Sequence, residues 1–592
     1  MTEELARAFQ LHQTGRLAEA EQAYRAMAAQ SPERSDVQYL LGVLMVQAGR
    51  PIEAEPHLAR TLSLSPGHAD AAYNLGVARQ ALGNWRGAVS AYRLAMRLGA
   101  DYPDVRLNLG AALQELGQFA EGELAYMEAL ALKPGDPGIL GNLAVLLKAT
   151  GRFEESLAAY GVAIAAAPAR VDLLLGRAAC LKELGRLEDA LAGLDAALGL
   201  EPASAEAHNN RGVVLNDLGR PSEAKAAFEE ALDIKPVYAE ARANLANVLL
   251  GLGRLEDALK AYDQALELKP ELINARFNRG FAQLLMGDYE RGWQGWENRF
   301  TLKDMQGFHL DGPVWDGQTP LNGPLLIQAE QGFGDTIHFL RYVPLLTKLG
   351  VECLIRCQDS LVSLVSRSFA GQARVISQDE TAPPYAAWVA VASLGHRLGT
   401  RLETIPTGIP YLIADPALEA AWAERLGEQG PKIGLVWRGN PGFKGERHRA
   451  PGLAPLAGLV RANPKLRWLS LQRDPFRQEL FELGLGEFIE DLGDGTDPLT
   501  GQDFDRTAAL IKTLDLVVTS DTAMAHLAGA LGAEVWVMLS SSPDWRWGRG
   551  GETTPWYPRL RLFRQSRPGA WEDVAQSLAV AIAARFPDSP PP

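Results

Sequence analysis

The first half of the chain has a helical pattern of apolar residues that repeats with a fixed period. Apolar side chains recur three or four positions apart, as on the buried face of an amphipathic helix, and a glycine interrupts them every 34 residues. Prolines follow on the same spacing, except where Ala100 stands instead. A glycine between two helices and a proline after them indicate helix–turn–helix units in tandem. The glycines are Gly15, Gly49, Gly83, Gly117, Gly151, Gly185, Gly219, Gly253 and Gly287, and the prolines are Pro32, Pro66, Pro134, Pro168, Pro202, Pro236 and Pro270.

Each unit also has a small residue where its two helices must touch, and a large ring to fill the groove beside it. Examples are Gly76 in a first helix and Tyr92 in a second helix. This pattern resembles the tetratricopeptide (TPR) repeat, and it predicts about nine repeats over residues 1–300. One unit cannot bury its own apolar face, so we expect an all-α superhelix whose first helices line a concave groove.

A row of asparagines lies two residues before the small position of the first helix. An amide side chain both donates and accepts hydrogen bonds, so such a row can hold the backbone of an extended peptide. The alternative is that these residues only tie adjacent helices together. A similar asparagine ladder lines the repeats of the eukaryotic O-linked N-acetylglucosamine transferase, where it grips protein substrates. The asparagines are Asn74, Asn108, Asn142, Asn210, Asn244 and Asn278.

The pattern changes after residue 300. Trp293 and Trp296 replace smaller residues in the last repeat, as expected where a solenoid packs against another domain. Residues 301–322 are rich in Gly, Pro and Asp without a period, which predicts a linker. From Leu325 onward, short apolar runs alternate with amphipathic helices, which predicts a parallel sheet covered on both sides.

Two such halves predict an α/β domain of two Rossmann-like lobes, in the arrangement called GT-B. The expected boundaries are residues 323–415 for the first lobe, 416–586 for the second and 587–592 for a disordered tail. Ligands of such folds bind at the carboxyl ends of the strands. The expected strands are LLIQAEQ, VECLIR, ARVIS, AAWVAVA, KIGLVWR, RWLSLQ, LDLVVTS and AEVWVML.

Charge and composition exclude several classes of function. The formal net charge of -14 argues against a nucleic-acid partner. The N-terminus lacks the basic region and apolar run of a signal peptide. The sequence contains no stretch of about 18 apolar residues, so we expect no membrane span. Three scattered cysteines predict buried thiols rather than disulfides. We therefore expect a cytoplasmic protein.

Three loops at strand ends carry the candidate chemistry. In GFGDTIH, glycines permit a tight turn, and Asp335 lies at the start of the helix that follows. Its side chain either only caps this helix or faces the ligand crevice at the carboxyl ends of the strands. In GNPGFKGERHR, the cations Lys444, Arg447 and Arg449 predict a site for phosphate or sugar carboxylate, unless they form a solvated surface cluster.

The third loop, SDTAMAHL, follows a strand and opens a helix. Ser520, Asp521 and Thr522 cap that helix, leaving free N–H groups where a phosphate would bind. His526 lies one turn further, on the same face as Thr522. Taken alone, this loop is only a well-capped helix.

The segments GDTIH (334–338) and DTAMAHL (521–527) resemble the two signatures of the ADP-heptose lipopolysaccharide heptosyltransferases, which are inverting GT-B enzymes that need no metal. The resemblance implies that Asp335 is the general base that deprotonates an acceptor hydroxyl. It implies no cofactor, and a nucleotide sugar as co-substrate. The residues expected on the donor side are Gly334, His338, Lys444, Arg447, Arg449, Ser520, Asp521, Thr522, Ala523 and His526.

The cationic loop and the tail DWRWGRGGETTPWYPRLRLFRQ (544–565) are similar to those of a bacterial group in which TPR repeats precede this domain. The group includes flagellin glycosyltransferases that attach a nonulosonic sugar such as pseudaminic acid. The chain departs from it at Phe443 and Ala450. The resemblance implies a protein O-glycosyltransferase acting on Ser or Thr of flagellin. Alternatives are a lipopolysaccharide or capsule acceptor, or a non-catalytic TPR scaffold; the oligomeric state stays open.

Overall fold

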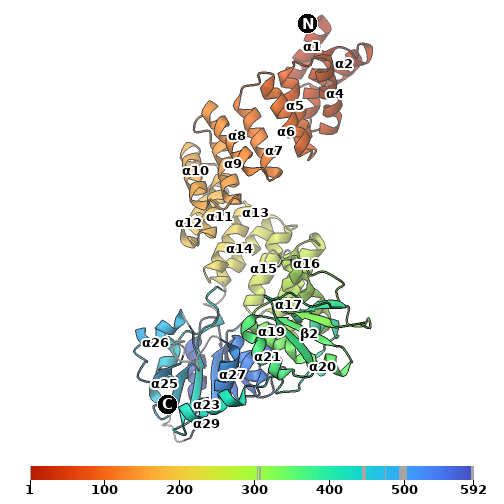
Figure 1. Cartoon of the computed structure of the whole chain (residues 1–592). Coiled ribbons are helices and arrows are strands. Elements are labelled where there is room, and N and C mark those ends of the chain that lie inside the picture. Colours follow the sequence, from red (N-terminus) through yellow and green to blue (C-terminus); the bar gives the residue numbers. More distant parts are fainter. Residues whose placement is uncertain are drawn as a thin grey trace. The chain divides into compact units, whose positions relative to one another are not determined.

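The computed structural model describes residues 2–302, 305, 308–442, 449–473, 475–492 and 503–587. The chain divides into two compact units, Met1–Pro236 and Val237–Pro592. The first unit consists of repeat helices, and the second combines the last two repeats with two parallel β-sheets (Figure 1).

The first unit is built from paired antiparallel helices, as the 34-residue period predicts. The turn glycines have left-handed backbone conformations, for example φ +68° at Gly49 and +78° at Gly151, which residues with a Cβ rarely adopt. Their predicted role in the turns is confirmed. The helices are α1 Glu3–Gln13, α2 Leu17–Gln30, α3 Ser35–Gln47, α4 Pro51–Leu64, α5 Ala69–Ala81, α6 Trp85–Arg97, α7 Pro103–Glu115, α8 Phe119–Leu132, α9 Pro137–Ala149, α10 Phe153–Ala166, α11 Val171–Glu183, α12 Leu187–Leu200, α13 Ala205–Asp217 and α14 Pro221–Ile234.

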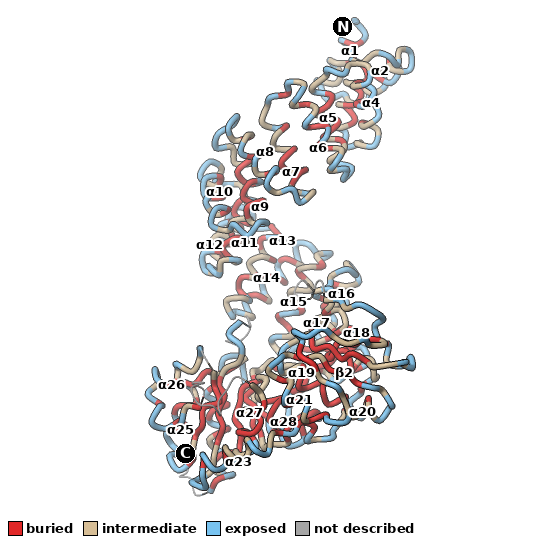
Figure 2. The backbone as a smooth tube through the Cα atoms, in the orientation of Figure 1, coloured by how far each residue is buried: buried red, intermediate tan, exposed pale blue. Residues whose placement is uncertain are grey.

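Small residues and rings hold each helix pair together. Tyr92 is fully buried, and a Cβ atom added to Gly76 would lie 2.4 Å from its Cε1. The same close approach recurs one and four repeats later, at Gly110 against Tyr126 and at Gly212 against Phe228. Buried stretches run along the faces where helices meet (Figure 2). The predicted pairing of small and large residues is therefore confirmed.

The second unit begins with four more repeat helices. They are α15 Ala239–Gly251, α16 Leu255–Leu268, α17 Ile273–Leu285 and α18 Tyr289–Trp296, followed by the 3-10 helix η1 Glu297–Thr301. Trp293 is buried, and its indole N–H donates to the carbonyl of Thr400 at 2.9 Å. Its ring meets Trp545 edge-on, with centroids 5.3 Å apart. Trp293 and Trp296 are thus interface core, as predicted.

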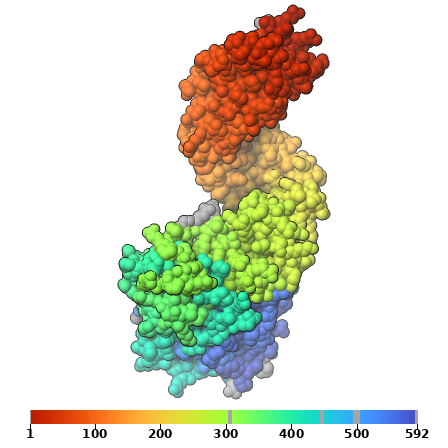
Figure 3. All heavy atoms as spheres, turned by 90° about the vertical axis from the view of Figure 1, so that its right-hand side faces the viewer, coloured from red at the N-terminus to blue at the C-terminus, as the bar shows by residue number. Residues whose placement is uncertain are grey.

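This packing explains where the second unit starts. The sequence pattern places the end of the solenoid at residue 300, whereas the compact unit starts at Val237. Residues of the last repeats share one apolar core with the sheets, because the two tryptophans insert between them. In Figure 3 the yellow-green repeat atoms adjoin both the green and the blue atoms of the α/β region.

Two all-parallel sheets form the α/β region within the described residues. The first has the strand order β3-β2-β1-β4, and the second has the order β10-β9-β8-β5-β6-β7. Both faces of the second sheet are buried: Leu516 and Val518 pack into one core, and Val517 packs into the other. The strands are β1 Leu325–Gln328, β2 Cys353–Cys357, β3 Ala373–Ser377, β4 Ala387–Ala390, β5 Lys432–Val436, β6 Arg467–Ser470, β7 Ile489–Asp491, β8 Leu516–Ser520, β9 Val535–Leu539 and β10 Leu560–Arg564.

The predicted strands are all present, and the structure adds β7 and β10 to them. Strand β7 has only three residues, and β10 alternates with exposed Arg561, so neither has a continuous apolar run. The α-helices of this region are α19 Phe333–Phe339, α20 Val343–Lys348, α21 Val362–Ser368, α22 Leu394–Arg397, α23 Pro416–Leu426, α25 Ala457–Ala462, α26 Glu479–Glu482, α27 Phe504–Lys512, α28 Ala523–Ala530 and α29 Trp571–Arg585.

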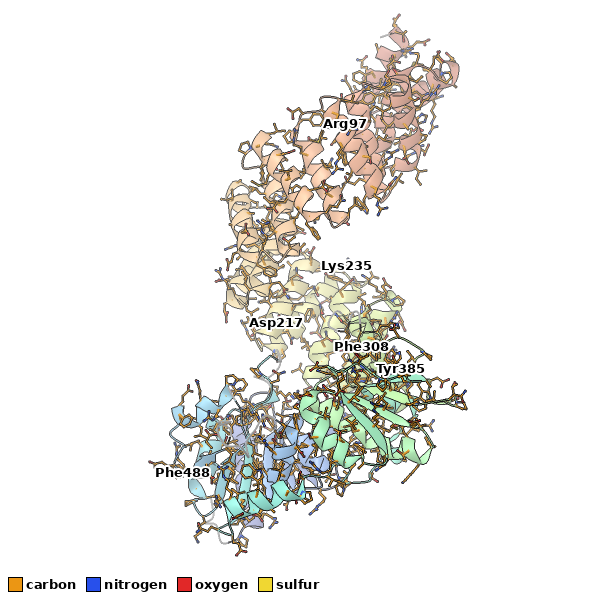
Figure 4. All side chains as sticks on the ribbon, viewed as in Figure 1. Arg97, Asp217, Lys235, Phe308, Tyr385 and Phe488 are labelled. Carbon is orange, nitrogen blue, oxygen red and sulfur yellow. The ribbon has the colours of Figure 1, made fainter. Side chains whose placement is uncertain are left out.

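The segment expected to be a linker extends the first sheet. The N–H of Trp315 donates to the carbonyl of Trp388 in β4, and the N–H of Trp388 donates to Pro313. Phe308 contacts the Trp388 ring, and the hydroxyl of Tyr385 donates to the carbonyl of Asp311 (Figure 4). The described part of 301–322 is therefore packed on the domain rather than free of it.

No helix in the described ranges is long and apolar enough to cross a bilayer. The predicted tail lies, apart from Pro587, outside the described residues.

Candidate functional site

One cavity of about 860 Å³ brings together the last repeats and the strand-end loops of both sheets. Its walls come from α15 and α17, from the loops after β1, β5 and β6, from the start of α28 and from η10 (Trp545–Trp547). The lining residues are Asn247, Leu250, Phe277, Asn278, Phe281, Trp296, Gln331, Gly332, Phe333, Gly334, Asp335, Val436, Arg438, Gly439, Asn440, Arg449, Leu471, Gln472, Arg473, Asp521, Thr522, Ala523, Met524, His526, Asp544 and Arg546.

Asp335 and Gly334 reach the cavity from the first turn of α19. Gly334 also allows α19 to approach α28, since a Cβ atom there would lie 2.9 Å from Cδ2 of His526. A side chain at 334 would push the two helices apart. Asp335 and the start of α28 therefore share one cavity, as expected for loops that follow the carboxyl ends of parallel strands.

Arg546 fixes the carboxylate of Asp335. Its Nη2 donates to Oδ1 of Asp335 at 2.5 Å, and its Nη1 donates to Oδ1 of Asp544 at 2.9 Å. The Arg546 side chain is only 5% exposed, so the guanidinium has one position between the two acids. Arg546 is not among the residues predicted from the sequence; the available signal was an arginine between Trp545 and Trp547.

A second ion pair lies at the start of α28. Arg449 contacts both carboxylate oxygens of Asp521, at 2.9 and 3.1 Å. Thr522 caps α28 by accepting from the N–H of Met524, and Ala523 is the first helical residue. Lys444 and Arg447, the other cations expected here, lie outside the described residues, as does Phe443.

Two further arginines, which are not among the residues predicted from the sequence, also line the cavity. Arg438 pairs with Glu479 at 2.5 Å, and Arg473 donates to the hydroxyl of Thr507 at 3.3 Å. Burial lowers the pKa of Arg473. With Arg449 and Arg546, four guanidinium groups of the described residues border this cavity in a chain of net charge -14.

His526 lines the cavity as a neutral imidazole. Burial, followed by the charge of Arg546, holds its pKa well below the ordinary value. Its Nδ1 is 3.0 Å from the hydroxyl of Tyr557, and its ring stacks on Trp547 with centroids 5.2 Å apart. His526 therefore offers a hydrogen bond to a ligand but no positive charge.

Two residues expected on the donor side do not line the cavity. His338 is fully buried: its Nδ1 is 3.2 Å from the hydroxyl of Tyr557, and its ring packs on Trp556. Ser520 is 1% exposed at the end of β8. Both side chains are buried and neither lines the cavity, so the structure does not bring these two residues together with the others expected on the donor side.

A buried carboxyl lies five residues before Asp335. Glu330 accepts from Nη2 of Arg299 at 3.0 Å, and Arg299 also donates to Glu297 of the terminal repeat. Burial raises the pKa of Glu330 to about 7, although Arg299 opposes this shift. The loop that carries Asp335 is thus tied to the end of the repeats.

The predicted asparagine row divides into different environments. Nδ2 of Asn74 donates within its own helix, to the carbonyl of Asp70. Asn108 and Asn278 instead donate to side chains of the preceding first helix, Tyr73 and Asn247. At those two positions the alternative, a tie between adjacent helices, is present. Asn142 is exposed, and Asn210 and Asn244 are half-buried.

Across the described residues, no group of three His, Cys, Asp or Glu side chains is arranged to hold a metal ion.

Comparison with known families supports the repeat assignment. Residues 5–69, 39–103, 73–137, 142–198 and 204–271 match tetratricopeptide repeat families. These residues therefore form tetratricopeptide repeats, which are joined to an α/β region with parallel sheets.

The chain is similar to Protein FlbA of Caulobacter vibrioides (strain ATCC 19089 / CIP 103742 / CB 15), with 30% identity over 324 residues. The match covers 49% of this chain and 52% of that protein, so the chain spans about half the length of this curated relative.

Two solved repeat structures are also similar. TTC0263, a thermophilic TPR protein in Thermus thermophilus, is 28% identical over 31% of this chain and 99% of that chain, with a TM-score of 0.28. A tetratricopeptide repeat protein from Parabacteroides merdae ATCC 43184 is 18% identical over 42% of this chain and 98% of that chain, with a TM-score of 0.36.

Proposed function

We propose that this protein is an inverting, metal-independent protein O-glycosyltransferase with a GT-B-like catalytic domain. It captures a polypeptide with its repeats and transfers a sugar from a nucleotide-activated donor to a Ser or Thr hydroxyl. The observation that supports this most directly is the single cavity that contains the Asp335 carboxylate, four arginines and a wall of repeat helices.

In the proposed reaction, Asp335 takes the proton of the acceptor hydroxyl while the hydroxyl oxygen attacks the anomeric carbon. The bond from that carbon to the phosphate oxygen of the donor breaks, and its electron pair stays on the phosphate. Arg546 occupies one oxygen of Asp335 and leaves the other for the proton.

The arginine-rich side of the cavity suits the departing phosphate. Arg449 and Arg473 have planar guanidinium groups, and the N-terminal end of the α28 dipole adds to the positive potential. His526, being neutral, contributes a hydrogen bond rather than charge to this site. Both interactions strengthen as negative charge develops on the leaving group.

The acceptor we propose is flagellin, and the sugar a nonulosonic acid such as pseudaminic acid, in the cytoplasm. This part rests on the resemblance of the cationic loop GNPGFKGERHR and of the tail from Asp544 to a bacterial group that includes flagellin glycosyltransferases. The TPR matches support a polypeptide partner in general.

The test is the intact mass of flagellin co-expressed with the full chain and the enzymes that make the nucleotide sugar. Wild type is expected to add whole sugar masses, and Asp335→Asn is expected to add none. The exposed Asp359, outside the cavity, gives the matched control Asp359→Asn, which should behave as wild type. Equal masses with wild type and Asp335→Asn would refute the catalytic role, and sugar found on lipopolysaccharide alone would refute the protein acceptor.

A further inference from the structure

The wall that the repeats give to the cavity differs chemically from the other walls. It consists of Asn247 and Leu250 in α15, Phe277, Asn278 and Phe281 in α17, and Trp296. None of these side chains is charged, whereas the α/β loops contribute four arginines and the three aspartates Asp335, Asp521 and Asp544 to the lining. A phosphate-bearing donor is therefore favoured among the α/β loops, and the repeat wall suits an uncharged group.

Two amides in this wall are held in a defined orientation. The buried Tyr262 donates its hydroxyl to Oδ1 of Asn247 at 2.5 Å, and Nδ2 of Asn278 donates to the same oxygen at 2.9 Å. The carbonyl of Asn247 is thereby used within the repeats. Judged on the described residues, the Nδ2 group of Asn247 and the Oδ1 atom of Asn278 are left as one donor and one acceptor.

Apolar rings border this amide pair. Phe277 lies against Trp296 with ring centroids 5.4 Å apart, and Phe277 and Phe281 stand one helical turn apart on α17. A donor and an acceptor beside an apolar surface match the N–H and C=O groups of an extended backbone whose neighbouring side chain is apolar.

We propose that Asn247, Asn278, Phe277 and Phe281 form an acceptor subsite that binds an extended polypeptide with an apolar or aromatic side chain next to the modified Ser or Thr. This subsite rests on the proposed function, because Asp335 in the same cavity marks where the hydroxyl must lie. It makes the cavity itself, and not only the repeat groove, selective for the sequence around the acceptor.

The test measures binding to the full chain by fluorescence anisotropy, without sugar transfer. The probes are two short labelled peptides of Gly and Ala with one Thr, flanked by Phe in one and by Asp in the other. The Phe peptide is expected to bind at least about tenfold tighter, since burial of an aromatic side chain stabilises the complex by this order. Equal affinities would overturn the proposal.

Variants separate the two parts of the subsite. Phe281→Ser should remove the preference for the Phe peptide, and Asn247→Asp, which removes the N–H donor, should weaken both peptides alike. Phe488→Ser is the control, because Phe488 is an exposed ring outside the cavity (Figure 4). A preference unchanged in Phe281→Ser would count against the subsite.

A second measurement on the wild-type chain does not depend on variants that fold. A peptide with benzoylphenylalanine in the flanking position should crosslink to α17, and CMP or UDP should not displace it. Crosslinks confined to the loop after β5, or displacement of the peptide by either nucleotide, would refute the proposal. Either result would indicate that Phe277 and Phe281 bind the nucleobase of the donor.

The two hypotheses fail separately. A Phe preference without sugar transfer would leave the subsite standing and remove the transferase. Sugar transfer without a preference for the Phe peptide would support the transferase and refute the subsite.

Discussion

The carboxylate of Asp335 and the guanidinium of Arg546 form an ion pair of 2.5 Å across 211 residues of sequence. The pair predicts that Arg546 acts through Asp335. Arg546→Met should lower kcat/KM by about a hundredfold, because the proposed base Asp335 loses its orientation, and Arg546→Lys should recover part of this loss, since it keeps the charge but not the fork.

A double-variant cycle checks this mechanism. If the two residues act together, Asp335→Asn with Arg546→Met should be no worse than Asp335→Asn alone. Losses that simply multiply would show that Arg546 acts elsewhere, on the donor for example. Far-UV circular dichroism and melting curves establish that each variant is folded.

Arg449 is predicted to contribute to nucleotide affinity. Arg449→Met removes a two-point contact with Asp521 and one of the cations beside the α28 N-terminus, so CMP or UDP should bind about tenfold more weakly by calorimetry. Arg461→Met, on a residue outside the cavity, is the control and should leave the affinity unchanged. The wild-type affinity should also fall as salt is added, and a salt-independent affinity would argue against a phosphate site.

The raised pKa of Glu330 should make the free energy of unfolding depend on pH. Burial raises its pKa from 4.5 to about 7, so in this window the folded chain keeps a proton that the unfolded chain has lost. Its contribution to stability is therefore complete below pH 4.5 and is lost as pH rises to about 7, by up to about 1.4 kcal/mol per pH unit.

Glu330→Gln cannot titrate, so its Tm should rise relative to wild type as the pH increases from 4.5 to 7.5. Glu380→Gln, on an exposed surface carboxyl, should show no such trend. A constant Tm difference between wild type and Glu330→Gln across this range would refute the raised pKa.

The close approach of α17 and α18 at Gly280 should exclude any larger residue at this position. A Cβ atom there would lie 2.5 Å from Cα of Gly295, and backbone cannot move aside as a flexible side chain does. Gly280→Ala should therefore destabilise the second unit by about 1–3 kcal/mol, seen as a lower denaturation midpoint.

Gly251→Ala is the matched control, since no atom lies within 4 Å of its added Cβ and alanine favours helix. Equal stability of the two variants would show that α17 and α18 can separate at little cost.

The sequence predicted the elements that depend on local periodicity. Turn glycines such as Gly49 repeat because the left-handed turn needs them, and strands such as β8 have continuous apolar runs because both faces are buried. Asp335 and Asp521 could be placed in one cavity because the carboxyl ends of parallel strands share an edge.

The remaining site residues depend on contacts between distant segments. Arg546 reaches Asp335 from a loop after β9, and Asn247 reaches the cavity only because the last repeats pack on the α/β region. His338 belongs to the same motif as Asp335, but Trp556 and Tyr557 enclose it from another segment. No local pattern specifies these neighbours.

The packing of Val237–Thr301 with the sheets has an evolutionary consequence. Repeats before Pro236 belong to a separate unit, so whole 34-residue modules can be gained or lost there while the cavity of the second unit keeps its lining. The final two repeats lack that freedom, because replacing them would change one wall of the cavity. Selection on the number of repeats and selection on the residues that line the cavity therefore act on different parts of the same gene.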